Sequence, residues 1–143
     1  PASRARAVSA FGAVAAETDR IHAAEADVYA PCALGATVFD RSIAEMQCTI
    51  VAGSANNQLA EARHGEVLRR NNILYAPDYV INGGGIINVC AEISGTYSRD
   101  WVDRKVHALM TTLGEVLDTA LSSGDPTNLV ADRIARERIG RGD

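Results

Sequence analysis

Lysine is almost absent from this sequence, since Lys105 is the single lysine among 14 lysine and arginine residues in a chain of 143. The chain also lacks an excess of basic charge, because its formal net charge is −4 and its isoelectric point is near 5.3. These values argue against a nucleic acid or an anionic membrane surface as the main partner. No apolar run approaches the roughly 20 residues that a membrane-spanning helix requires, so we expect no membrane partner.

Cysteine is scarce and shows no pattern. Cys32, Cys48 and Cys90 are odd in number and lack metal-ligand spacing, so the sequence predicts no disulfide framework and no metal site. Free thiols suit a reducing compartment and no signal peptide is visible, which together favour a cytoplasmic protein. The three histidines are far apart and share no motif, so surface or helix-cap roles are favoured over metal binding. They are His22, His64 and His107.

The chain has the length of one ordinary domain and can bury a core. It begins at Pro1 without methionine and runs almost directly into a helical pattern that Ser3 can cap. The apolar face of that pattern consists of Ala7, Val8, Phe11 and Val14. This start resembles a cut through a larger protein, so we expect an N-terminal part of the same polypeptide to precede it.

Short apolar runs that end in small residues predict three strands, over residues 27–30, 49–52 and 73–75. A helical turn near residues 42–46 and a polar helix over residues 61–70 lie between them. Strands of this length that alternate with helices are typical of parallel βαβ units. The sequence therefore predicts an α/β fold with a parallel sheet.

The pattern changes to helices after Val89. Ser98 can cap a long helix that ends at Gly124, and Asp125 and Pro126 restart a last helix as its N-cap and first residue. The predicted apolar face of the long helix consists of Val102, Val106, Leu109, Leu113, Val116, Leu117 and Ala120. Residues 94–143 are thus predicted to be C-terminal helices that pack on residues 1–93.

Three loops follow the predicted strands, over residues 31–35, 53–57 and 76–85. In open α/β sheets, ligands bind at the carboxyl ends of the strands, where these loops lie. Their small residues, carboxamides and glycines suit a nucleotide, although the fingerprint G-x-G-x-x-G appears nowhere in the chain. The run Gly83-Gly84-Gly85 allows either close helix packing or the close approach of a ligand.

Three segments of the chain match the motifs of a known family: Ala30-Pro-Cys-Ala-Leu-Gly35, Val51-Ala-Gly-Ser-Ala-Asn-Asn-Gln-Leu59 and Tyr75-Ala-Pro-Asp-Tyr-Val-Ile-Asn-Gly-Gly-Gly-Ile-Ile-Asn-Val89. Together they resemble the leucine/phenylalanine/valine branch of the amino-acid dehydrogenases. The resemblance covers nearly the whole chain. It implies the C-terminal part of a Rossmann-type doubly wound parallel sheet, followed by C-terminal helices. In that family an NAD-binding domain faces a substrate domain, and the enzyme oxidatively deaminates an L-amino acid to a 2-oxo acid.

The resemblance implies roles for two of the loops in binding NAD. Cys32 and Ala33 would border the phosphate–ribose portion of the cofactor. Ala55 and Asn56 would reach the nicotinamide ribose, and Asn56 would also approach the substrate amino group. Taken alone, the asparagine pair could be an ordinary turn, and Cys32 could be a nucleophilic thiol instead of part of a cofactor wall.

The resemblance also implies that the helix after the glycines lines the substrate side-chain pocket, with Ile86 and Val89 against the substrate. Two aliphatic residues on one helical face favour a branched-chain aliphatic amino acid, leucine- or valine-like, over an aromatic one. Taken singly, both residues could instead belong to a core. Gly83 stands where relatives usually carry alanine, which leaves the exact shape of the pocket open.

The family's catalytic lysines and its catalytic aspartate belong to the substrate domain, so the resemblance places no catalytic residue in this chain. Lys105 lies between charged neighbours and is predicted to be a solvated surface residue. In the strand order 3-2-1-4-5-6, the strand over residues 27–30 would be the third and the next one the fourth. This predicts that the first two strands are missing and that residues 27–30 have no partner strand.

Three functions from different classes therefore stay open. The first is the cofactor-binding half of an NAD-dependent amino-acid dehydrogenase, which the family resemblance would make a homo-oligomer. The second is a non-catalytic nucleotide-binding module, which the absent fingerprint and the single lysine favour. The third is an oligomerisation module built on the two C-terminal helices.

Overall fold

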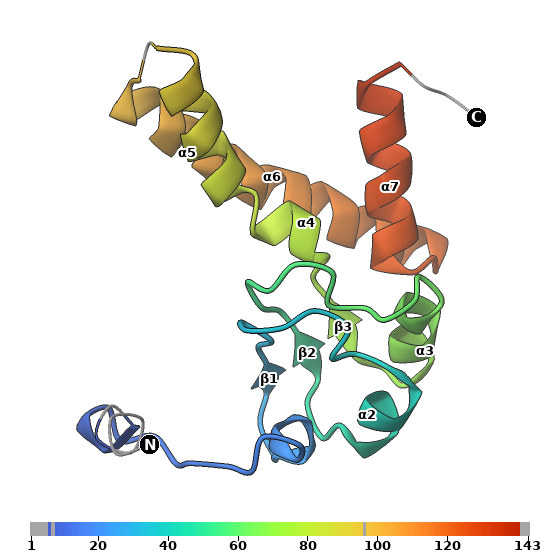
Figure 1. Cartoon of the computed structure of the whole chain (residues 1–143). Coiled ribbons are helices and arrows are strands. Elements are labelled where there is room, and N and C mark those ends of the chain that lie inside the picture. The colour runs from blue at the N-terminus through green and yellow to red at the C-terminus, as the bar shows by residue number, and fades with distance from the viewer. Residues whose placement is uncertain (1–5, 7, 96, 141–143) are drawn as a thin grey trace.

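Three short parallel strands organise the chain in the computed structural model, which describes residues 6, 8–95 and 97–140 (Figure 1). The elements in chain order are η1 (Ile21–Ala23), β1 (Val28–Tyr29), α2 (Asp40–Glu45), β2 (Ile50–Val51), α3 (His64–Arg70), β3 (Leu74–Tyr75), α4 (Asp78–Ile81), α5 (Gly84–Ile93), α6 (Arg99–Ser123) and α7 (Thr127–Arg138). The predicted α/β class and the positions of the three strands are confirmed.

The strand order is β1-β2-β3, and every pair is parallel. Val28 pairs with Ile50, and Ile50 pairs with Leu74. The prediction that the first strand has no partner, because two strands separate it from the next, is therefore wrong. Each crossover, through α2 and then α3, returns the chain to the position directly beside the preceding strand, as expected within one half of a doubly wound sheet.

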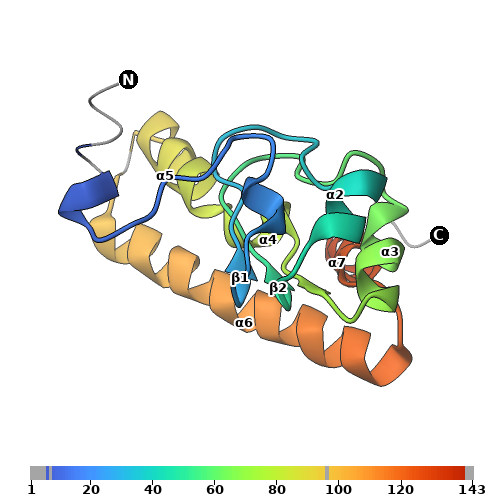
Figure 2. The ribbon, with the colours of Figure 1, turned by 90° about the horizontal axis from the view of Figure 1, so that it is seen from below.

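Two clusters of buried apolar side chains form the core. The first lies between the sheet and helices α2 and α3, and the second joins α4, α6 and α7. Figure 2 shows α6 crossing the molecule beside the sheet, and its contacts with α4, α5 and α7 connect the C-terminal helices to the rest. The first cluster contains Val38, Ile43, Cys48, Val51, Leu68, Ile73 and Tyr75. The second contains Val80, Val116, Ala120, Val130, Ala131 and Ile134.

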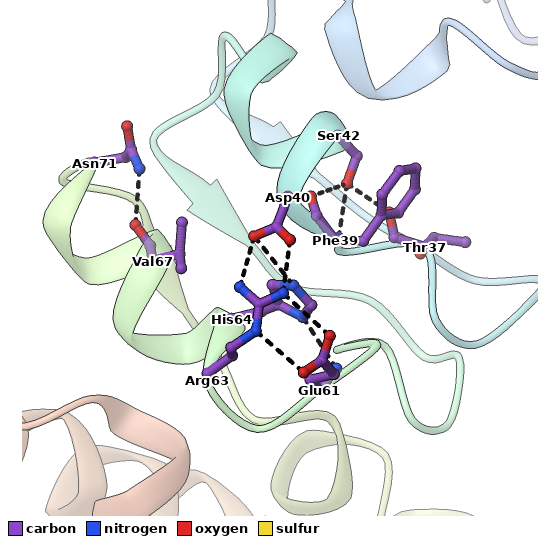
Figure 3. Close-up of polar contacts among 9 residues, drawn as sticks. All are labelled: Thr37, Phe39, Asp40, Ser42, Glu61, Arg63, His64, Val67 and Asn71. Carbon is purple, nitrogen blue, oxygen red and sulfur yellow. Dashed lines mark hydrogen bonds and ion pairs between the residues drawn. The ribbon is translucent and has the colours of Figure 1, made fainter.

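A polar network fixes the crossover helices α2 and α3 to each other (Figure 3). The Arg63 guanidinium donates to both Asp40 carboxylate oxygens, at 2.7 and 2.6 Å, and also pairs with Glu61. His64 begins α3 and is 1% exposed, and its Nδ1 accepts the backbone N–H of Glu61 at 3.0 Å. His64 is therefore an interior residue that braces the segment before α3, and the expected surface or helix-cap role is wrong for it.

The ends of α6 agree with the sequence, whereas the start of α7 differs by one residue. The Ser98 hydroxyl accepts the Trp101 N–H at 3.3 Å, and Gly124 ends the helix with a left-handed φ of 75°. Pro126 is the N-cap of α7 and not its first residue, because its ψ of 139° is extended. Asp125 instead pairs with Arg133 at 3.1 Å.

The apolar face predicted near the N-terminus is mostly exposed where the structure describes it. Phe11 and Val14 are 87% and 90% exposed, whereas Val8 is partly buried. The predicted cap Ser3 and face residue Ala7 lie outside the described residues. Within the described part of the chain, no helix is both long and apolar enough to cross a membrane.

Candidate functional site

The three loops that follow β1, β2 and β3 meet at one edge of the sheet, which we call the loop edge (residues 31–35, 53–57 and 76–85). Because the strands are parallel, all three carboxyl ends point to this side. The Ala55 N–H donates to the Pro31 carbonyl at 2.9 Å, and the Ala36 N–H donates to the Asn57 carbonyl at 2.7 Å. The first two loops are therefore hydrogen-bonded to each other through their backbones.

Two glycines permit this contact between the first and second loops. A Cβ added at Gly53 would overlap the backbone O, N and C atoms of Pro31. A Cβ added at Gly35 would lie 2.6 Å from the Asn56 carbonyl oxygen. A side chain at Gly53 or at Gly35 would therefore collide with the backbone of the other loop. The two loops approach this closely only because both positions are glycine.

The glycine run at the start of α5 has a different role. A Cβ at Gly83 would contact the Leu109 side chain at 3.4 Å, and one at Gly84 would contact Val106 at 3.7 Å, both on α6. Nothing lies within 4 Å of a Cβ added at Gly85. Close helix packing, one of the two interpretations left open, therefore applies to the first two glycines, and Gly85 leaves the backbone of α5 accessible.

Asp78 joins the second loop to the third. Its side chain is 5% exposed, and its two carboxylate oxygens accept the Asn57 N–H at 2.6 Å and the Tyr75 hydroxyl at 2.5 Å. Burial and the hydrogen bond to Asp78 both raise the pKa of Tyr75, so the phenol keeps its proton. Sequence reasoning missed Asp78, although an acidic residue in the first turn of a helix is a recognisable signal of the helix start.

The asparagine pair in the second loop combines both of the roles considered for it. Asn57 has a left-handed φ of 54°, which asparagine tolerates better than most residues, so it serves the turn. Asn56 is exposed, and its side-chain Oδ1 accepts a hydrogen bond from Asn82 Nδ2 at 2.6 Å. Asn82 lies directly before the glycine run, so the second loop is held against the start of α5.

The structure brings the predicted cofactor residues onto adjoining loops. Cys32 and Ala33 are exposed in the first loop beside a cavity of about 530 Å³, whereas Ala55 is 6% exposed and faces the interior. Side-chain and backbone hydrogen bonds with Ser54 of the second loop lower the pKa of the Cys32 thiol. Cys32 and Ala33 are therefore exposed on the first loop and Asn56 on the second, while the Ala55 N–H and carbonyl are already bonded to Pro31 and Gln58.

Ile86 and Val89 lie on one face of α5 and do not belong to either core cluster. They are 63% and 44% exposed, which excludes the interpretation that they are core residues. Lys105 is exposed on α6 with its ammonium group 5.6 Å from the centre of the Trp101 ring, so its predicted surface position is confirmed.

The loop edge can bind and orient a ligand, but it offers little for proton transfer. Its exposed polar side chains are carboxamides, the Ser54 and Tyr79 hydroxyls and the Cys32 thiol, and within the described residues no three His, Cys, Asp or Glu side chains could hold a metal ion. Carboxamides and hydroxyl groups suit an uncharged, hydrogen-bonding ligand portion such as a ribose or an amide.

The sequence profile of the family described as Glutamate/Leucine/Phenylalanine/Valine dehydrogenase matches residues 3–138 of this chain. A leucine dehydrogenase of Bacillus cereus is 48% identical over 134 residues, which cover 94% of this chain and 36% of the relative. A phenylalanine dehydrogenase of Thermoactinomyces intermedius is 40% identical, with 86% of this chain and 33% of the relative covered. The chain thus spans about a third of the length of these curated relatives.

The fold has a counterpart among solved structures. The crystal structure of L-tryptophan dehydrogenase from Nostoc punctiforme superposes with a TM-score of 0.91 at 39% sequence identity. The superposition covers 98% of this chain and 42% of the other.

Proposed function

Because the chain belongs to the glutamate/leucine/phenylalanine/valine dehydrogenase family, we propose that it is the cofactor-binding half of an NAD-dependent amino-acid dehydrogenase. The observation that carries this proposal is the joining of three loops into one hydrogen-bonded loop edge by Asp78 and Asn82. Relatives named for leucine, phenylalanine and tryptophan share the chemistry of oxidative deamination of an amino acid.

The residues of the loop edge fit a nicotinamide nucleotide. In this proposal Cys32 and Ala33 border its phosphate–ribose portion, and Ala55 and Asn56 border the nicotinamide ribose. The accessible backbone at Gly85 leaves room for a flat ring, and the lack of exposed charge suits an uncharged ribose and carboxamide. When bound, NAD supplies the acceptor for the hydride that leaves the amino-acid α-carbon.

The side chains of α5 give the proposal its substrate class. Ile86 and Val89 expose apolar surface on one face of α5, the helix that begins shortly after Asn82. Apolar surface of this kind favours an aliphatic side chain, so we propose a branched-chain amino acid such as leucine or valine. Asn56 would align substrate and cofactor, since the alignment of reacting atoms is a large part of such catalysis.

The part of the enzyme that performs proton transfer lies outside these 143 residues in this proposal. Residues 1–93 would form one half of a Rossmann-type sheet, and residues 94–143 the C-terminal helices that pack on it. The remaining length of the relatives would supply the other sheet half, the substrate domain and its lysines. Exposed apolar side chains such as Leu121 and Ile139, at 87% and 63%, suit contacts with another chain in a homo-oligomer.

An assay of NAD reduction tests the proposal. The native polypeptide that carries this chain should reduce NAD at alkaline pH with leucine or valine, and more slowly with phenylalanine. The 143-residue chain alone should show no activity, because the proposed proton-transfer groups are outside it. Activity from the 143-residue chain would refute the proposal that the proton-transfer groups lie outside it. A native polypeptide that is inactive with all three amino acids would favour the non-catalytic nucleotide-binding or oligomerisation module.

A further inference from the structure

A chain of hydrogen bonds sets the orientation of the Asn56 side chain. Asn82 Nδ2 lies 3.5 Å from the Ser54 carbonyl oxygen and 2.6 Å from Asn56 Oδ1. A backbone carbonyl can only accept a hydrogen bond, so the Asn82 carboxamide must present its NH2 group on this side. The same NH2 group then donates to Asn56, which must accept this hydrogen bond with its side-chain oxygen, Oδ1.

The consequence for Asn56 is a fixed polarity. Asn56 Oδ1 accepts the hydrogen bond from Asn82, so the other end of the Asn56 carboxamide is its Nδ2 donor group. This Nδ2 group makes no hydrogen bond to any residue that the structure describes. Asn56 is exposed at the loop edge, so this NH2 group is available to a ligand. An NH2 group donates hydrogen bonds and cannot accept them, so it recognises an oxygen and not an ammonium group. The approach of Asn56 to the substrate amino group that the resemblance implies would therefore not be a hydrogen bond to a protonated amine.

The backbone beneath Asn56 is fixed independently of Asn82. The Asp78 carboxylate holds the next N–H, that of Asn57, at 2.6 Å, and Asn57 sits at a left-handed φ of 54°. The Gly35 and Gly53 contacts fix the other side of the loop. With the backbone held in this way, the remaining freedom of Asn56 is the rotation of its side chain, which is the freedom that Asn82 removes.

We propose that Asn82 is a positioning residue that turns the Asn56 carboxamide so that its NH2 donor meets a hydroxyl or carbonyl oxygen of the bound ligand. The orientation stands on the geometry alone, whereas its effect on turnover rests on the proposed dehydrogenase function. In this proposal Asn82 does not itself contact the reacting atoms, because it acts through Asn56.

The orientation can be tested in the 143-residue chain by NMR of the Asn56 side-chain amide. Asn82→Ala removes the donor and should make that NH2 group more mobile. Asn82→Asp replaces the donor with a carboxylate that only accepts, so Asn56 should turn its NH2 inward and its amide protons should shift downfield. Asn71→Ala is the matched control, since Asn71 is also a helix C-cap whose side-chain amide donates to a backbone carbonyl, Val67 O (Figure 3).

Turnover by the native polypeptide tests the consequence. Asn82→Ala should lower kcat about tenfold and Asn82→Asp about a hundredfold, with smaller changes in KM, because the inverted amide repels the oxygen that it should bind. In an Asn56→Ala background, both substitutions should have no further effect. A merely structural role would give losses that persist in that background and would not rank the charged variant below alanine.

Unchanged Asn56 amide spectra in both Asn82 variants would overturn the proposal. Equal kcat in the Asn82 and Asn71 variants of an active native polypeptide would also overturn it. An inactive wild-type polypeptide would refute the proposed function alone, and the amide spectra would still decide the orientation.

Discussion

The Gly53→Ala variant should be less stable than the parent chain by about 3 kcal/mol, the upper end of the roughly 1–3 kcal/mol typical of overpacking a tightly packed site. The added Cβ would overlap three backbone atoms of Pro31, which cannot rotate away as a side chain would. Pro31 is itself buried, and its carbonyl is held by the Ala55 N–H at 2.9 Å. The two loops must therefore separate, and nicotinamide nucleotide binding should weaken with them.

Urea unfolding followed by circular dichroism measures this change, with Gly114→Ala as the control. Gly114 lies within α6 with nothing within 4 Å of an added Cβ, so alanine should be neutral or stabilising there, by up to about 1 kcal/mol. Equal midpoints for Gly53→Ala and the parent chain would show that the first two loops are not packed as described.

The Asp78→Ala variant should lose about 3 kcal/mol of stability. Removing the carboxylate leaves the buried Tyr75 hydroxyl without its acceptor, and it also releases the N–H of Asn57, which is an exposed residue. A buried donor left unsatisfied costs about 1–3 kcal/mol. The second loop should then lose its link to α4, and the ¹⁵N order parameters of residues 53–57 should fall.

Asp132→Ala provides a matched control, because Asp132 also accepts a tyrosine hydroxyl, that of Tyr79, at 2.7 Å. This pair is exposed, and the Tyr79 hydroxyl can donate to the Asn128 carbonyl at 2.9 Å instead. The control should therefore cost less than about 1 kcal/mol in the same urea experiment. A similar loss in the two variants would contradict the bridging role of Asp78.

The sequence predicts local features well because local chemistry determines them. Apolar runs that end in small residues locate all three strands, and Ser98 and Gly124 mark the ends of α6. The meeting of the three loops also follows from the sequence, since parallel strands place their carboxyl ends at one edge. The order of the strands cannot be predicted from the sequence, because a strand of two residues has too few side chains to specify which strand it pairs with.

The parts of the site that the sequence could not predict depend on contacts between distant segments. The run Gly83-Gly84-Gly85 is conspicuous in the sequence, yet a much closer approach of two backbones occurs at Gly53, where β1 and β2 bring their loops together. Asp78 and Asn82 gain their roles only when α4 lies against the second loop. Asp78 bonds a residue 21 positions away along the chain, and Asn82 bonds one 26 positions away. Exposure of Ile86 and Val89 is likewise set by packing that periodicity alone does not reveal.

Titration of the ¹⁵N-labelled 143-residue chain with NADH tests most directly whether the loop edge is the cofactor face. Amide signals of Cys32, Ala33, Ala55, Asn56 and Gly85 should move together, while those around the second cavity, of about 410 Å³ between α3, β3 and α6, should stay unchanged. Shifts confined to that second cavity, at residues such as Arg69 and Thr127, would contradict the assignment of the loop edge to the cofactor.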